Sequence, residues 1–294
     1  MTLEVGAVAA GKAVVSAGAG LAKGDASERA SLRELAKDSP ALKAAAENYA
    51  RRVAIRQGVL LRFYLPLRKW AGLAGDYFDT TFPSELAEKL ADIPEDNLAT
   101  PAPGLAIPAM QGLAYNVDEP DLKEMYLNLL ATATDGRRQD EAHPAFVQVI
   151  KQLAPAEAGL LMKCLAAETL PLVAINRGLP EGKGGGYTPL YTHLMDWQRT
   201  EEGRVELPMA PVYVDNWTRL GLFIADYDAW LTAEGRYDWA EKRPELERLR
   251  AEFETDGRKV VWEKGVLRIT DFGRRFRSAI ATPPEDPADS AAGA

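Results

Sequence analysis

The sequence predicts a mainly α-helical protein with a small α+β unit near the C-terminus. Over much of the chain before residue 170, apolar residues recur at three- and four-residue steps, as they do on the buried face of a helix. Short β-favouring runs follow in the last third, between further helical segments. The length of 294 residues suggests about two domains, because a domain typically has ~150 residues.

Shifts in composition divide the chain further. Several prolines between residues 75 and 117 mark the end of an N-terminal helical region. The final segment is rich in proline, acidic and small residues, so we expect it to be disordered. The expected parts are a Gly/Ala-rich arm at 1–25, a basic amphipathic helical region at 26–75, a central helical domain at 76–170, an α+β domain at 171–282 and a disordered tail at 283–294.

The overall composition is ordinary for a globular protein, and the sequence contains no standard catalytic motif. A net charge of −8 argues against a non-specific nucleic-acid binder, which is usually basic. A single cysteine, Cys164, excludes an internal disulfide framework and fits a reducing, cytoplasmic setting. There are two histidines and no zinc, nucleophile-elbow or dinucleotide motif, so we expect a non-enzymatic protein without a cofactor.

Two N-terminal segments raise the alternative of contact with an anionic membrane, as a peripheral protein at the inner membrane. Residues 5–22 have almost transmembrane length, but they are mostly Gly and Ala with Lys12 in the middle, which favours a mobile or loosely packed arm. Segment 43–69 has a local charge of +6, from seven basic residues and one acid (7 − 1). Either it is a core helix with a solvated basic side, or it presents an interaction surface to lipid headgroups or phosphates. The arginines of that surface are Arg51, Arg52, Arg56 and Arg62.

The central domain contains a helix whose start is well marked in the sequence. In "DEPDLKEMYLNLLATATDG", Asp118 and Glu119 precede Pro120, so acids lie at the positive helix end and proline lies in the first turn. An apolar stripe at helical spacing follows and ends before Gly136. We interpret the two acids as helix-start residues rather than metal ligands. Shorter helices are expected at 84–91 and 108–115.

The next helix begins after His143. Pro144 has a fixed φ and no amide hydrogen, which suits the first helical turn. We therefore interpret His143 as a structural residue at the helix cap, because no nucleophile or metal set accompanies it. A further helix is expected to begin at Pro155.

The last third combines strands with helices. We expect a strand at 172–176, a helix in "VDNWTRLGL" closed by Gly221, and a charged helix at 242–255. "KVVWEKGVLRIT" is interpreted as a hairpin that turns at Lys264-Gly265.

A final helix is expected to follow Thr270. It carries Phe272 and Phe276, which we expect to pack onto the helix ending at Leu220. Helices followed by a two-stranded wing and another helix together predict a winged-helix-like domain.

Four segments together give a resemblance to a known family. "DEPDLKEMYLNLLATATD", "HPAFVQVIKQLAPAEAGLL", "DNWTRLGL" and "LRITDFGRRF" occur in an order and spacing that resemble the abortive infection alpha family of bacterial proteins, over roughly residues 90–280. The chain departs from the family pattern at Ala154, where a serine is usual. The recurrent family positions, which we interpret as structural, include Asp118, Glu119, His143, Pro144, Asn216, Arg219, Gly221, Phe272, Gly273 and Phe276.

The resemblance implies a role in bacterial defence against phage. We expect a cytoplasmic effector that is toxic in the sense that it stops the growth of the infected cell. We expect an unidentified protein partner or phage component to trigger it. A membrane-active effector using the N-terminal arm and a winged-helix DNA-binding regulator remain open alternatives. DNA is the weaker one, because the expected recognition helix at 212–220 offers only Arg219 against Asp215. A homo-oligomer is also open.

Overall fold

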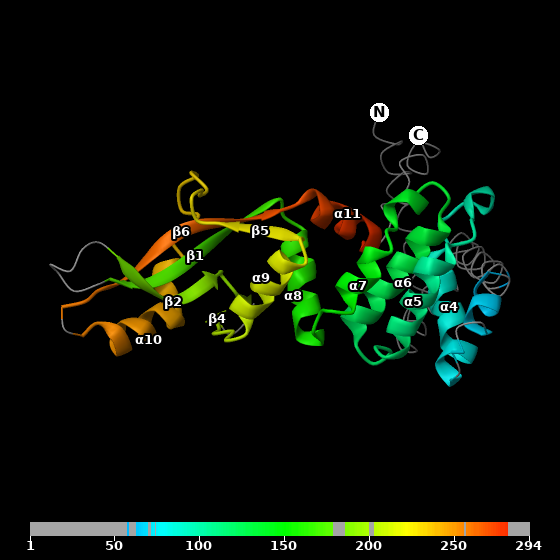
Figure 1. The fold of residues 1–294 in the computed structure, drawn as a ribbon, viewed down its shortest axis with the longest axis horizontal. Helices are drawn as coiled ribbons and strands as arrows, with labels where there is room; N and C mark the ends of the chain where they lie inside the picture. The colour runs from blue at the N-terminus through cyan, green and yellow to red at the C-terminus, as the bar shows by residue number, and fades with distance from the viewer. Residues whose placement is uncertain are drawn as a thin grey trace, which may run out of the picture. The chain divides into compact units, whose positions relative to one another are not determined.

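The computed structural model describes Gly58 and residues 63–69, 72–73, 75–178, 186–199, 203–255 and 257–281. The chain divides into two compact units (Figure 1). Met1–Gln152 together with Ser278–Ala294 form one, here called the helical unit, and Leu153–Arg277 form the other, the sheet unit. Of the parts expected from the sequence, the arm at 1–25 and the tail at 283–294 lie outside the described residues.

The helical unit contains short and medium helices joined by tight turns. A helical stretch at residues 63–69 comes first. The elements that follow are η1 (Tyr77–Thr81), α4 (Phe82–Lys89), η2 (Glu95–Asn97), α5 (Pro103–Ala114), α6 (Pro120–Thr134), η3 (Gln139–Glu141) and α7 (Ala145–Ile150).

Helix α6 is the buried centre of this unit. Eleven of its fifteen residues are buried, and Pro120 occupies its first turn, as the sequence predicts. The helix expected at 108–115 is α5 and begins earlier, at Pro103, so Pro108 lies inside it. Burial of its apolar side chains offsets the backbone hydrogen bond that Pro108 cannot make, because Leu105 and Met110 are both at most 2% exposed.

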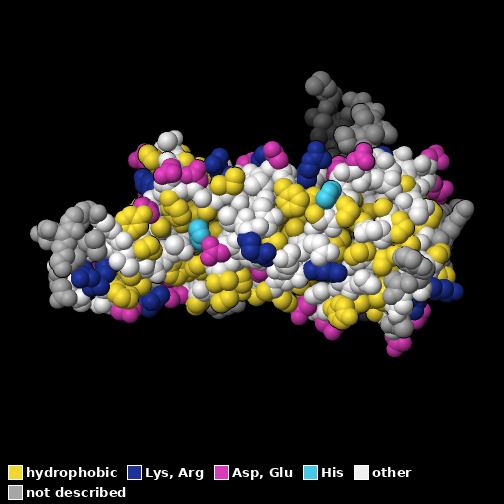
Figure 2. Space-filling model, viewed as in Figure 1, with side chains coloured by type: hydrophobic (Ala, Val, Ile, Leu, Met, Phe, Trp, Pro, Cys, Tyr) yellow, Lys and Arg dark blue, Asp and Glu magenta, His cyan; other side chains and the backbone are white. Residues whose placement is uncertain are grey.

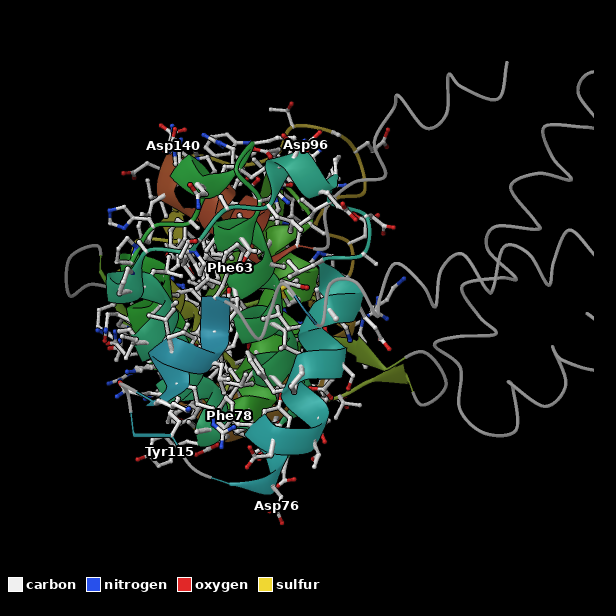
Figure 3. All side chains as sticks on the ribbon, turned by 90° about the vertical axis from the view of Figure 1, so that its right-hand side faces the viewer. Phe63, Asp76, Phe78, Asp96, Tyr115 and Asp140 are labelled. Atoms are coloured by element: carbon white, nitrogen blue, oxygen red, sulfur yellow. The ribbon has the colours of Figure 1, made fainter. Side chains whose placement is uncertain are left out.

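An aromatic cluster joins the first described helix to α6. Tyr64 is 2% exposed and its hydroxyl lies 2.7 Å from Thr134 Oγ1, while it donates to the Leu130 carbonyl at 3.1 Å. The Tyr64 ring packs edge-on against Phe82 with 5.9 Å between ring centroids. The Phe82 centroid lies 5.3 Å from that of Phe78, which is labelled in Figure 3. The basic region therefore ends in a helix that is bound into the core of the helical unit.

The C-terminal end of the last described helix, α11 (Asp271–Ile280), accepts hydrogen bonds from α6 and from Arg138 just beyond it. Asn128 donates to the carbonyl of Ile280 at 2.8 Å, and Thr132 donates to the carbonyl of Ala279 at 2.9 Å. Arg138 donates to the Ser278 carbonyl at 2.7 Å. These three side chains, of which Asn128 and Thr132 are buried, cap carbonyls at the helix C-terminus that have no partner within the helix itself.

The sheet unit contains a four-stranded antiparallel sheet in the order β2-β1-β6-β5. Its elements are α8 (Pro155–Leu165), β1 (Thr169–Gly178), β2 (Tyr187–Leu194), β3 (Gln198–Arg199), β4 (Gly203–Arg204), α9 (Ala210–Arg219), β5 (Phe223–Asp226), η4 (Ala240–Lys242), α10 (Pro244–Phe253), β6 (Val260–Ile269) and α11 (Asp271–Ile280). Strand β1 pairs along its length with β6, from Thr169 opposite Arg268 to Arg177 opposite Val260.

One hydrophobic cluster joins the sheet to α10. Val173 and Ile175 of β1 are fully buried, and Leu246 and Leu249 of α10 and the ring of Trp239 are buried against them. Apolar residues on alternate positions of β1 face this helix, which is why the pattern "LVAIN" reads as a buried strand.

The structure corrects the predicted fold class in two respects. The protein is mixed α+β rather than mainly α-helical, because the sheet spans much of its C-terminal half. The hairpin expected to turn at Lys264-Gly265 is wrong: residues Val260–Ile269 form the single continuous strand β6. The two strands expected to form the wing are therefore one strand, and the described residues do not show a winged helix.

The reason for the error lies at Gly265. A Cβ at this position would lie 2.6 Å from Cδ1 of the Tyr227 ring and 3.0 Å from the Asp226 carbonyl oxygen. The glycine therefore serves the close approach of an aromatic ring to a strand, and not a turn. Lys-Gly between β-favouring runs gives the same local signal in both cases.

Candidate functional site

A cavity of about 770 Å³ lies in the sheet unit. This volume is within the range of small-molecule sites in proteins, roughly 300–1,000 Å³. Three segments form its wall: α8, the start of β1, and the chain from the end of β2 to just beyond β4. The lining residues are Ala156, Leu160, Lys163, Cys164, Leu170, Pro171, Met195, Asp196, Trp197, Val205 and Leu207.

One face of α8 forms the first wall. Ala156, Leu160 and Cys164 are four residues apart, so they lie on the same side of the helix. Pro155 begins this helix, and the Glu157 carboxylate accepts the backbone amide hydrogen of Ala154 at 3.0 Å. Only this half of a capping box is present, because alanine has no oxygen to accept in return.

A buried arginine fixes the opposite wall. The Arg243 side chain is fully buried and pairs with Glu245 through two hydrogen bonds, of 2.9 and 2.5 Å. It also donates to the backbone carbonyls of Trp197 at 2.8 Å and Val205 at 2.9 Å, and both of these residues line the cavity. The planar guanidinium thereby holds the two sides of the β3–β4 hairpin at a defined distance.

Polar groups are few in the cavity. The Asp196 carboxylate accepts from Arg204 at 2.9 Å and lies 3.9 Å from Arg243. The Trp197 indole nitrogen is buried and has no hydrogen-bond partner among the described residues. Burial raises the pKa of the Cys164 thiol to about 12, so the thiol stays protonated and unreactive.

A second polar cluster lies elsewhere in the sheet unit, around His193 at the end of β2. Its backbone φ is +57°, a left-handed conformation that non-glycine residues rarely adopt. The Tyr227 hydroxyl accepts the backbone N–H of His193 at 3.0 Å and lies 3.1 Å from its Nδ1. Nε2 of His193 lies 3.0 Å from the Asp215 carboxylate.

These contacts assign the imidazole's protons. The Tyr227 hydroxyl, already an acceptor for the amide, donates to Nδ1, and Nε2–H donates to Asp215. Burial lowers the pKa of His193, although Asp215 opposes this, so the ring is neutral near pH 7. The side chains of His193, Tyr227 and Asp215 therefore hydrogen-bond to one another. This arrangement indicates that they stabilise the strained backbone at the end of β2, and does not indicate an open catalytic site.

Residues 76–280 match the family described as abortive infection alpha, over more than half of the chain. The chain belongs to the abortive infection alpha family. No curated protein and no solved structure matches it. The match confirms the resemblance seen in the four sequence segments and extends it toward the N-terminus.

The abortive infection alpha positions on α9 form one connected group. Asn216 donates to the Glu157 carboxylate on α8 at 2.9 Å and accepts from Arg219 at 2.6 Å. Glu157 thus joins the cap of α8 to the middle of α9 and is 3% exposed. The sequence places Glu157 in the first turn of a helix, but no motif in it predicts the contact between Glu157 and Asn216.

A second group surrounds the end of α9 and the start of α11. Gly221 has φ +75° and its carbonyl accepts from the Thr270 hydroxyl at 2.5 Å, and that hydroxyl accepts the Gly273 amide hydrogen at 2.8 Å. A Cβ at Gly273 would overlap the Leu222 carbonyl oxygen. A Cβ at Gly221 would lie 4.0 Å from the Phe272 ring, so these family positions meet where α11 crosses the end of α9. Phe276, one turn further along α11, is fully buried.

The remaining predicted residues lie apart from the cavity, in the helical unit. Asp118 is exposed, and Glu119 is the residue before α6. His143 and Pro144 precede α7, and His143 Nδ1 accepts the amide hydrogen of Ala145 at 3.1 Å. The surface of Arg51, Arg52, Arg56 and Arg62 lies outside the described residues.

The described part of the chain holds no group of three or more His, Cys, Asp or Glu residues suited to a metal ion. None of its helices is long and apolar enough to cross a membrane. On the face shown in Figure 2, acidic and basic side chains are interspersed rather than gathered into a patch of one sign.

Proposed function

We propose that this protein is an abortive-infection effector in bacterial defence against phage, and that it stops growth of the infected cell. The observation that carries the proposal is the match of residues 76–280 to the abortive infection alpha family. The effector acts by binding and not by catalysis. The cavity in the sheet unit supports this part, since an apolar volume with a few polar groups is typical of ligand sites.

The structure bears on the DNA-binding alternative but not on the membrane alternative. The DNA-binding alternative depended on a basic wing, and the residues expected to form that wing are one strand of a sheet. The membrane alternative depends on residues 5–22 and on Arg51, Arg52, Arg56 and Arg62, which lie outside the described residues.

Inducible expression in a phage-sensitive bacterium tests the proposal. Phage infection of induced cells should halt growth of the culture and lower the number of phage released, compared with cells carrying an empty vector. Fractionation of the same cells before and after infection locates the protein. Normal phage release from induced cells that contain the folded protein would contradict the proposed role.

A matched variant makes the test depend on the cavity. Replacing Leu160, which lines the cavity, by Trp fills part of the volume, whereas replacing the exposed Ala166, the C-cap residue of the same helix, by Trp does not. Loss of defence in the first variant alone ties the phenotype to the cavity. Equal defence in both variants places the effector function elsewhere.

A further inference from the structure

We infer that the cavity in the sheet unit binds a small amphipathic carboxylate, with an aliphatic hydrocarbon tail and one carboxylate head. This ligand class goes beyond the proposed function and is tested without phage. The inference depends on the volume, lining and charge of the cavity.

The body of the cavity requires an apolar ligand. Leu160, Leu170, Pro171, Met195, Val205 and Leu207 supply aliphatic surface on every wall. Burying apolar ligand surface against such a lining is favourable in proportion to the area removed from water. A volume of about 770 Å³ accepts a chain of around ten carbon atoms with room to spare.

The charge around the cavity selects the sign of the head group. Among the described lining residues, Asp196 is the one carboxylate, and Arg204 and Arg243 lie within ion-pair distance of it. Lys163 is the one cationic side chain among those same residues. Lys163 has no carboxylate partner in the described ranges and is exposed to solvent at the edge of α8.

Counting these groups gives a net positive site. The described cations are Lys163, Arg204, Arg243 and Arg248, and the described acids are Asp196, Glu206 and Glu245, so their sum is +1 (4 − 3). An anionic head group therefore completes the charge balance, and a cationic one increases the imbalance. The unpartnered Trp197 indole N–H belongs to the same wall and adds a donor, not an acceptor.

The wall is fixed before any ligand binds. Arg243 holds the carbonyls of Trp197 and Val205 through hydrogen bonds of 2.8 and 2.9 Å. A rigid wall reduces the ordering cost that binding would otherwise carry. The site is therefore suited to a small ligand that enters a formed cavity.

Isothermal titration calorimetry of the full-length protein with decanoate, decanol and decylamine tests the inference. We expect decanoate to bind with one site and a Kd of ~10–100 µM, as for an efficient ligand of this size. Lys163→Gln should weaken decanoate binding about threefold to fivefold, the effect of one partly exposed ion pair, and leave decanol binding unchanged. Decylamine should bind more weakly than decanol.

Two tryptophan variants locate the site. Leu160→Trp should abolish decanoate binding, and Ala166→Trp should bind decanoate like the wild type. Failure of decanoate to bind the wild type would overturn the inference. So would equal loss of decanoate and decanol binding in Lys163→Gln, a preference for decylamine, or unchanged binding in a folded Leu160→Trp protein.

Discussion

The close contact of Gly265 with Tyr227 gives a quantitative prediction for Gly265→Ala. The new Cβ would lie 2.6 and 2.9 Å from two carbons of the Tyr227 ring, so the ring must move. Overpacking of this kind costs about 1–3 kcal/mol. Movement of the ring also lengthens the bond from the His193 amide to the Tyr227 hydroxyl, which adds about 1 kcal/mol. We expect a total loss of about 2–4 kcal/mol in the free energy of unfolding.

Thermal unfolding followed by circular dichroism measures this loss. At about 2–4 °C per kcal/mol, Gly265→Ala should lower Tm by about 5–15 °C. Gly178→Ala is the matched control in the neighbouring strand, since its Cβ would meet the Lys259 carbonyl oxygen at an ordinary 3.6 Å. In a Tyr227→Ala background the cost of Gly265→Ala should fall to about 1 kcal/mol, because the ring clash is gone and only the 3.0 Å contact with the Asp226 carbonyl oxygen remains. A Tm for Gly265→Ala within about 1 °C of wild type would refute the reasoning.

Three further changes test other parts of the structure. Phe276→Ala should cost about 3–5 kcal/mol in urea unfolding, because its ring is fully buried, and a cost below about 1 kcal/mol would show that α11 is not packed as described. His143→Asn should keep both Tm and defence, since asparagine also accepts the Ala145 amide hydrogen; loss of defence at unchanged Tm would make His143 functional. The pKa of the Cys164 thiol is about 12 in the folded protein against 9.0 unperturbed, so stability from the protonated thiol is present below about pH 9 and lost as pH rises toward 12. At pH 8 the thiolate fraction of Cys164 should accordingly be about 1,000-fold lower in buffer than in urea, and labelling by an aromatic disulfide reagent correspondingly slower; equal rates would show an open site.

Local signals were sufficient for most helices. Pro120 and Pro155 occupy first turns of α6 and α8, and Gly221 with φ +75° closes the chain after α9. Each of these signals acts within a few residues of the helix end it specifies. Such features can be read from a single sequence because no distant contact is needed to form them.

The sheet was harder to predict, because distant contacts decide it. Gly265 follows a lysine between two β-favouring runs, which is also the pattern of a hairpin turn. Only the Tyr227 ring lying against that position shows why the glycine is there. The strand then pairs on both sides, with β1 and β5, which a hairpin could not do.

The candidate site could not be assembled from the sequence. Its lining comes from α8, β1 and the β3–β4 hairpin, and no motif links Leu160 to Val205. Arg243 belonged to a segment expected only as a charged helix, yet its side chain is fully buried against Glu245. The Tyr227–His193–Asp215 cluster likewise depends on the left-handed backbone conformation of His193, which no residue pattern in the sequence predicts.

The most direct test of the central claim is survival of infected cells at two ratios of phage to bacteria. An abortive-infection effector protects a culture when few cells are infected, because each infected cell stops growing before it releases phage. When almost every cell is infected, the whole culture should stop growing. The account therefore predicts protection at low ratio and growth arrest at high ratio, with viable counts falling in step with the infected fraction. Infected cells that survive and divide at high ratio would contradict it.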